Sequence, residues 1–164
     1  MVRVSRCSME LTSASSLMGL ILVAWLLAAC RPIPTFTDHQ GQPITLTEFQ
    51  GKPLLINYFA PWCAPCLREM PRLNALAAEG DIAILAINYD PTTVADLAKL
   101  AQQYQIQIPL VLANDPASLP FPRPSGLPTS YLLDRKGELI DTFIGELDQP
   151  QITELKRKVH AMPD

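Results

Sequence analysis

The sequence predicts an α/β fold, with a mixed central β-sheet and helices on both faces, and three observations support this prediction. Apolar strand-like runs alternate with segments whose apolar residues recur at helical spacing. The last two strand-like runs are joined by a turn signal that ends in Gly137. A helical segment then closes the chain. Strand–helix alternation favours parallel strands and a hairpin adds an antiparallel pair, so both kinds of pairing are expected in one sheet.

Each expected element has its own signal. The strands are short apolar runs, and in chain order they cover residues 44–46, 54–60, 82–89, 109–113, 129–133 and 138–144. The helices carry apolar residues three and four positions apart, and they cover residues 64–78, 91–104 and 149–159. Pro61 ends the second strand and Gly80 ends the first helix, because these residues do not continue such elements well.

Length and composition fit one globular domain. The 164 residues are 48% hydrophobic, which is enough for a core, and their formal net charge is −3. Nucleic-acid-binding domains carry a basic surface. We therefore expect no nucleic-acid partner, and we expect a monomer.

The first thirty residues form a separate unit. Leu17 to Ala29 is an unbroken apolar stretch of 13 residues, shorter than the roughly 20 residues that a membrane-spanning helix needs. The stretch runs directly into Cys30 through small residues, and this arrangement resembles a bacterial lipoprotein signal. An uncleaved anchor helix is the alternative.

The lipoprotein resemblance implies a division of the chain. Residues 1–29 would be a removed signal peptide, Cys30 the lipid-attachment residue, residues 30–35 a lipidated tether, and residues 36–164 the folded domain. Both alternatives predict the same location, on the extracytoplasmic side of a bacterial membrane, facing the periplasm or the cell surface. The lipid on Cys30 would hold the domain to that membrane.

Two thiols lie at the expected junction between a strand and a helix. The segment Trp62-Cys63-Ala64-Pro65-Cys66 follows the apolar run 54–60 almost directly. A thiolate on Cys63 would face the free N–H groups and the positive dipole end of the helix, which stabilise negative charge. Two thiols at this spacing can cycle between a dithiol and a disulfide, which indicates a thiol-disulfide exchange site.

A zinc site and a structural disulfide are the two alternatives for this pair. Structural zinc needs four Cys or His ligands, but the other two cysteines, Cys7 and Cys30, fall in the front segment. A disulfide across so short a loop stabilises little. We therefore expect Cys63 to attack a substrate disulfide and Cys66 to resolve the resulting mixed disulfide. No metal ion or other cofactor is expected.

Further motifs complete a family resemblance that covers residues 35 to 160. Pro71 lies five residues after the second Cys, Gly126-Leu127-Pro128-Thr129 precedes a strand, and Gly137 marks the hairpin. Together with the Cys motif, these residues resemble the thioredoxin fold. The extra strand and helix at 82–104, the lipoprotein-like front and Glu69 are most similar to the TlpA-like, ResA-like branch of membrane-tethered thiol-disulfide oxidoreductases.

The resemblance implies a substrate-binding rim around the Cys pair. Pro128 matches the family's cis-proline, so the Leu127–Pro128 bond is expected to be cis and the Leu127 backbone to meet an extended substrate segment. Trp62 and Pro65 are expected to contact the substrate beside the disulfide. For Trp62, a plain core position is the alternative.

Glu69 lies one helical turn after Cys66, on the same helix face. It matches the acidic residue that ResA-like proteins have near the active site, which implies a carboxyl of raised pKa that moves protons during exchange. The alternative is a solvated Glu that pairs with Arg72 at i+3. Asn57 stands where many thioredoxins have a buried Asp, so the chain departs from the wider family there.

The resemblance also implies partners. The substrates would be disulfide-containing envelope proteins, with apocytochrome c among them, and a membrane-embedded thiol donor would recharge the Cys pair. A copper-binding protein of the Sco type is an alternative, but it needs a wider Cys spacing and a late ligand His, and His160 falls in the last helix. A peroxiredoxin-like peroxidase needs a Thr where Ala60 stands.

The segment 114–125 is rich in proline and leads into Gly126-Leu127-Pro128. It is expected to lie at the rim of the Cys site. Long, stiff loops in such places are often functional, so a part in choosing the partner is one interpretation. A tolerated surface loop is the other.

Overall fold

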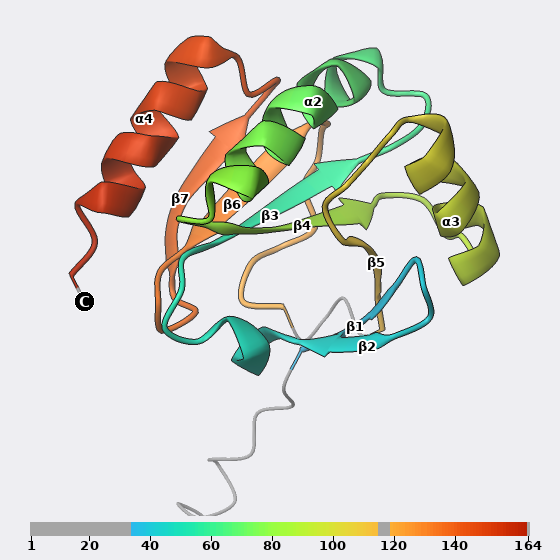
Figure 1. The fold of residues 1–164 in the computed structure, drawn as a ribbon, viewed down its shortest axis with the longest axis horizontal. Helices are drawn as coiled ribbons and strands as arrows, with labels where there is room; N and C mark the ends of the chain where they lie inside the picture. Colours follow the sequence, from blue (N-terminus) through green and yellow to red (C-terminus); the bar gives the residue numbers. More distant parts are fainter. Residues whose placement is uncertain (1–33, 115–118, 164) are drawn as a thin grey trace, which may run out of the picture. The chain divides into compact units, whose positions relative to one another are not determined.

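A seven-stranded mixed β-sheet organises the protein, which we describe from a computed structural model over residues 34–114 and 119–163 (Figure 1). The elements, in chain order, are β1 (Thr35–Asp38), β2 (Pro43–Thr45), η1 (Leu46–Phe49), β3 (Leu54–Phe59), α2 (Ala64–Glu79), β4 (Ala83–Asn88), α3 (Val94–Gln103), β5 (Leu110–Ala113), β6 (Thr129–Leu133), β7 (Leu139–Ile144) and α4 (Gln149–His160). The expected signal peptide and Cys30 lie outside the described residues. In the described ranges, no helix has the length and apolar character needed to cross a membrane.

The strands lie in the order β2-β1-β5-β4-β3-β6-β7. Strands β3, β4 and β5 run parallel. On the other side of β3, β6 pairs antiparallel with β3, and β7 pairs antiparallel with β6. The hairpin β1–β2 pairs antiparallel with β5. All six residues of β3 are buried. A strand that is covered on both faces reads as one apolar run, which is why the sequence predicted it well.

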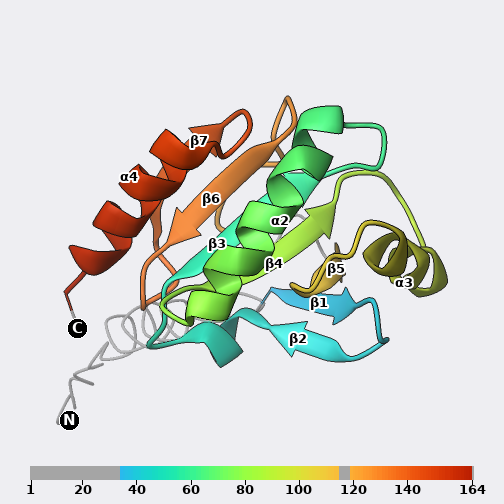
Figure 2. The ribbon, with the colours of Figure 1, turned by 45° about the horizontal axis from the view of Figure 1, so that its top comes forward.

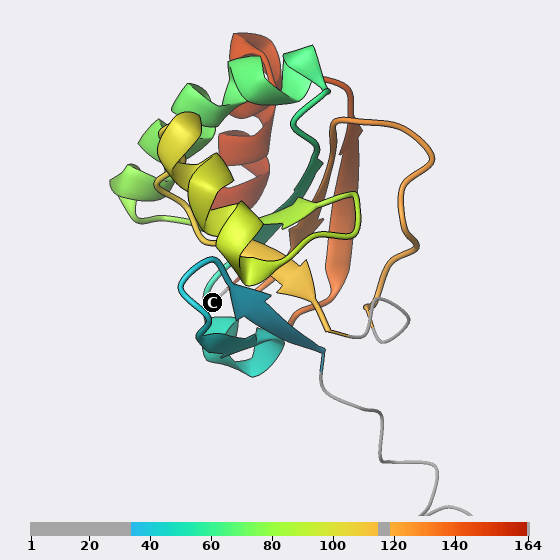
Figure 3. The same ribbon diagram turned by 90° about the vertical axis from the view of Figure 1, so that its right-hand side faces the viewer.

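All three α-helices pack on one face of the sheet, which corrects the expected placement of helices on both faces (Figure 3). One core cluster contains Met70 of α2, Leu97 of α3 and Leu155 of α4, whereas the cluster on the other face contains no residue of these helices. The cause is topological. Because β3, β4 and β5 follow one another in one direction across the sheet, right-handed crossovers put both connecting helices on the same side.

Irregular chain from the proline-rich segment covers the second face instead. The ring of Phe121 stacks on Tyr131 with 4.3 Å between centroids and meets Tyr58 edge-on at 6.5 Å. The Tyr131 hydroxyl donates to the Pro122 carbonyl at 2.9 Å, which ties the loop to β6. Neither interpretation of segment 114–125 foresaw this packing role, because one Phe among prolines carries no periodic signal.

Strand β1 is the strand that the sequence analysis missed. It begins at Thr35, inside the stretch expected to be a tether, and only Phe36 of its residues is buried. Phe36 joins the core cluster on the face that lacks helices. A four-residue strand at the side of a sheet, with a single apolar residue, has too little alternation to stand out from a linker.

Helix α2 positions the Cys pair. It lies over the sheet with α3 and α4 on either side (Figure 2). Cys63 is its N-cap and Pro65 lies in its first turn, where a missing N–H costs nothing. Gly80 ends it in the left-handed region, with φ of 91°. The helix therefore begins directly after Cys63, its N-cap, and continues past Pro71 to Glu79.

Replacing Phe121 tests the role of the loop as a core cover. The change Phe121→Ala should lower the free energy of unfolding by about 3 to 5 kcal/mol, because it removes a buried aromatic ring. Urea unfolding of the oxidised protein measures this loss. Ser125→Ala, an exposed change in the same segment, should have little effect. Equal and small losses in both variants would contradict the packing role.

Candidate active site

The two cysteines form a disulfide where β3 ends and α2 begins. Cys63 retains 5% of its surface exposed, and Cys66 is fully buried. This difference agrees with the expected order, in which Cys63 meets a partner and Cys66 acts from inside. The Cys66 N–H also donates to the Cys63 Sγ at 3.3 Å. A thiolate on Cys63 would accept the same bond at the positive end of the helix dipole.

The strand register places Pro128 at the end of the sheet where β3 leads into the Cys motif. Tyr58 of β3 pairs with Thr129 of β6, so Pro128 is one position beyond, next to the end of β3 that leads into the Cys motif. The peptide bond between Leu127 and Pro128 is cis, as the resemblance implied. Pro128 is buried and Leu127 is half-buried. The backbone at Leu127 thus lies at the edge of the site.

Trp62 is a surface residue, with 66% of its surface exposed, and the core alternative is wrong for it. Its indole Nε1 donates to the Asp90 Oδ2 at 2.6 Å. Asp90 follows β4, so this bond holds the exposed ring next to Cys63 on the β4 side. Pro65 is half-buried in the first turn of α2. Trp62 therefore offers an apolar surface directly before the reactive cysteine.

Glu69 is fully buried, which contradicts the solvated alternative. Its Oε1 accepts a bond from the Asn57 Nδ2 at 2.8 Å, and its Oε2 accepts the Leu147 N–H at 2.7 Å. Arg72, the partner that the alternative assumed, bonds Glu146 and the Leu147 carbonyl. The carboxyl thus lies inside the protein, one helical turn from Cys66.

Burial raises the pKa of Glu69 to about 7, because a buried carboxylate loses its hydration. Two hydrogen bonds, from the Leu147 N–H and from the Asn57 amide, act in the opposite direction. Among the charges, Glu146 raises this pKa and Arg72 lowers it. A carboxyl that titrates near neutral pH can both take up and release a proton there.

Three groups of this site were not singled out as site residues from the sequence. The Asn57 amide bonds both Glu69 and the Ser130 hydroxyl, the latter at 2.9 Å. Asn57 had a signal, because it is the one strongly polar residue in an apolar strand run. Nothing in the sequence pattern pointed to Ser130 or to the backbone of Leu147. They reach Glu69 or its partner only through the sheet pairing and the loop after β7.

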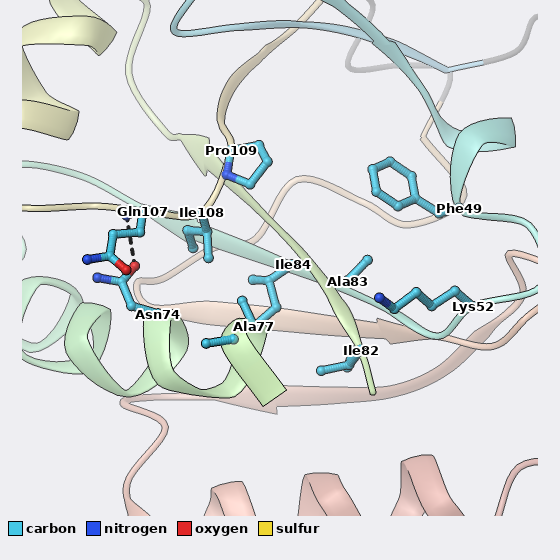
Figure 4. Close-up of a pocket in the computed structure, with 11 residues that line it drawn as sticks. Phe49, Lys52, Asn74, Ala77, Ile82, Ala83, Ile84, Gln107, Ile108 and Pro109 are labelled. Atoms are coloured by element: carbon cyan, nitrogen blue, oxygen red, sulfur yellow. Dashed lines mark hydrogen bonds between the residues drawn. The ribbon is translucent and has the colours of Figure 1, made fainter. Parts of the chain in front are cut away.

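Two of the surface pockets in the described part of the chain lie away from the disulfide, and neither cysteine lines them. One, of about 360 Å³, lies at the C-terminal half of α2 between Asn74, Ala77, Ile84 and Lys52 (Figure 4). Ala77 is about 16 Å from Cys66 along the helix. The other, of about 530 Å³, is lined by Tyr89, Asp90 and Arg123. Within residues 34–114 and 119–163, no cluster of three or more His, Cys, Asp or Glu side chains is arranged to bind a metal ion.

The chain is similar in sequence to known thiol-disulfide oxidoreductases. The chain matches the AhpC/TSA family over residues 29–153. It is 32% identical over 126 residues to the thiol-disulfide oxidoreductase ResA of Bacillus thuringiensis subsp. konkukian, a match that covers 75% of this chain and 72% of the relative. It is 34% identical over 141 residues to the thiol:disulfide interchange protein DsbE of Pseudomonas fluorescens biotype C, covering 82% of this chain and 77% of the relative.

A solved structure has a similar fold. The crystal structure of the pneumococcal exposed lipoprotein thioredoxin Etrx1 from Streptococcus pneumoniae aligns with a TM-score of 0.65 at 20% identity. The alignment covers 76% of this chain and 97% of that one. The predicted thioredoxin fold is therefore confirmed.

Glu69 should make the stability of the oxidised protein fall as the pH rises. Between about pH 4.5 and about pH 7, the folded state still holds the Glu69 proton while the unfolded state has released it. Unfolding is therefore favoured by about 3 kcal/mol more at the upper end than at the lower. Urea unfolding at several pH values, with Glu69→Gln as reference, measures the difference. Glu79→Gln, an exposed change on α2, should retain the native pH dependence. If Glu69→Gln retains it too, the carboxyl is not titrating in this range.

Proposed function

Because the chain belongs to the AhpC/TSA family, and within it resembles the ResA-like thiol-disulfide oxidoreductases of the thioredoxin superfamily, we propose that it reduces disulfides of envelope proteins. The observation that carries the proposal is the Cys63–Cys66 disulfide at the start of α2, in which Cys63 is slightly exposed and Cys66 is fully buried. A peroxiredoxin-like peroxidase would need a Thr three residues before the reactive Cys63, and this chain has Ala60 at that position.

The reaction uses the two thiols in sequence. In the reduced protein, the Cys63 thiolate attacks one sulfur of a substrate disulfide, and the other substrate sulfur leaves as a thiolate and takes up a proton. The Cys66 thiol then loses its proton and attacks the Cys63 Sγ. This closes the Cys63–Cys66 disulfide and releases the second substrate thiol. The substrate gains two electrons from the Cys pair and two protons. One proton is balanced by the proton that Cys66 releases, and the other comes from solvent, because Cys63 reacts as the thiolate.

Glu69 is proposed to accept the proton that Cys66 releases. Cys66 is fully buried, so water does not reach its thiol readily, and Glu69 is one helical turn away with a pKa of about 7. A Glu69→Gln variant that resolves a mixed disulfide as fast as the native protein, from about pH 5 to about pH 9, would contradict this role.

The substrate segment is proposed to lie across the exposed rim of the disulfide. Leu127 supplies backbone hydrogen-bonding groups beside the cis-proline Pro128, and Trp62 and Pro65, which are close to Cys63 in the sequence, supply apolar contact. Backbone recognition suits a reductase that acts on several proteins, because it reads little of the substrate's side chains.

The chain is proposed to work on the extracytoplasmic side of a bacterial membrane, anchored by a lipid on Cys30. The tether supports the reducing direction: the few residues before Phe36 reach at most about 3.5 Å each, which keeps the domain near a membrane-embedded thiol donor. We propose cytochrome c maturation as one use of this reducing power. Membrane fractionation tests the anchor, since Cys30→Ser should move the protein out of the membrane fraction.

Replacing Cys66 tests the proposed reaction in the native host. A Cys66→Ser variant cannot resolve the mixed disulfide, so it should accumulate covalent adducts with its substrates, and mass spectrometry identifies them. A Cys63→Ser variant, which retains only the buried thiol, should give few or none. Adducts that contain only cytoplasmic proteins, or equal adducts from both variants, would contradict the proposal.

A further inference from the structure

One oxygen of the Glu69 carboxyl is held by backbone rather than by a side chain. The Leu147 N–H donates to Oε2 at 2.7 Å, and this is the largest of the contributions that lower the pKa of Glu69. Leu147 lies in the short loop between β7 and α4. A loop donor is only as well placed as the loop itself. Whatever fixes Leu147 therefore also sets how well the carboxyl is held.

Arg72 binds the opposite side of the same residue. Its Nε donates to the Leu147 carbonyl at 2.8 Å, and its Nη2 donates to Glu146 Oε1 at 2.6 Å. Arg68, one turn earlier on α2, binds Glu146 Oε2 by two donors and makes no bond to Leu147. Leu147 is thus fixed at its N–H by Glu69 and at its carbonyl by Arg72, and all three α2 side chains meet one loop.

We propose that Arg72 is a positioning residue for the exchange site: it holds Leu147 in place, and the Leu147 N–H in turn fixes the Glu69 carboxyl. The inference rests on the proposed proton-carrying role of Glu69. The shape of the guanidinium explains the residue type, because one planar fork can donate to a carboxylate and a carbonyl at once. A lysine at position 72 carries the charge but not the fork.

A plain charge effect is the competing explanation, so the charged and polar groups around Glu69 matter. From α2 comes Arg72, and Arg68 of the same helix binds Glu146. From β3 and β6 come the neutral Asn57 and Ser130, and from the loop after β7 comes Glu146. By charge alone, Arg72 lowers the pKa of Glu69 and Glu146 raises it. The two explanations therefore predict different results when Glu146 is removed.

The experiment follows Glu69 directly in the oxidised full chain, where neither active-site thiol titrates. Carbon NMR of the Glu69 carboxyl gives its midpoint pH, and the amide proton of Leu147 reports whether the hydrogen bond persists. Arg72→Lys and Arg72→Leu should each raise the midpoint from about 7 to about 8 and shift the Leu147 amide signal upfield. Arg68→Leu, the matched control, should change both much less.

Two further comparisons decide between position and charge. Glu146→Ala removes the Arg68 bonds to the loop and one of the two Arg72 bonds, but the bond from the Arg72 Nε to the Leu147 carbonyl remains. Positioning therefore predicts a midpoint no lower than the native one, whereas charge alone predicts a lowered midpoint. Arg72→Lys keeps the charge, so charge alone predicts the native midpoint. A native midpoint in Arg72→Lys, or a lowered midpoint in Glu146→Ala, overturns the proposal. Arg72→Lys is the milder of the two changes at this position, so it still tests the proposal if Arg72→Leu does not fold.

Exchange kinetics separate this inference from the proposed function. If Glu69→Gln exchanges disulfides like the native protein at every pH, the proton-carrying role fails, yet the midpoints in the oxidised protein still test Arg72. If Glu69→Gln slows exchange while the Arg72 variants leave the midpoint unchanged, only the positioning role fails. If both hold, the pH profile of exchange in Arg72→Lys should move upward with the Glu69 midpoint.

Discussion

The buried carboxyl of Glu69 joins three parts of the molecule: helix α2, strand β3 and the loop after β7. A carboxyl without water needs hydrogen-bond partners, and here they come from β3 through Asn57 and from the loop after β7 through Leu147. The helix that carries Glu69 also carries the disulfide. The hydrogen bonds to this one carboxyl therefore fix how α2 lies against both the centre of the sheet and the loop that follows the β6–β7 hairpin.

The same constraint leaves a mark on its neighbour. Asn57 donates to both Glu69 and Ser130, and its own carbonyl oxygen Oδ1 is buried without a hydrogen-bond partner. A buried acceptor without a partner is costly. Asn57 in the middle of β3 thus leaves its own carbonyl oxygen unsatisfied while its amide holds the Glu69 carboxyl. Functional sites often contain such an unsatisfied buried group.

Sequence patterns predicted the parts of the fold that depend on local periodicity. The buried strands β3 and β4 and the helix α2 fall within a residue or two of their expected bounds. The Cys pair and Glu69 were also predictable, the first from spacing and the second from a family resemblance. The placement of all helices on one face, the bond to Leu147 and the role of Arg72 depend on which segments meet in space. No short pattern in the chain encodes those contacts.

The aromatic stack on the helix-free face has a consequence for how such proteins diverge. Where a helix would cover that face, any change of length would alter the register of a whole packed surface. Here the Phe121 ring and the hydrogen bond from Tyr131 to the Pro122 carbonyl fix the loop to β6, only a few residues before Leu127 and the exchange site. Loops tolerate insertion and deletion far better than helices. The chain before Phe121 can therefore lengthen or shorten from one lineage to another, and reshape the surroundings of the disulfide, while the residues that exchange electrons stay as they are.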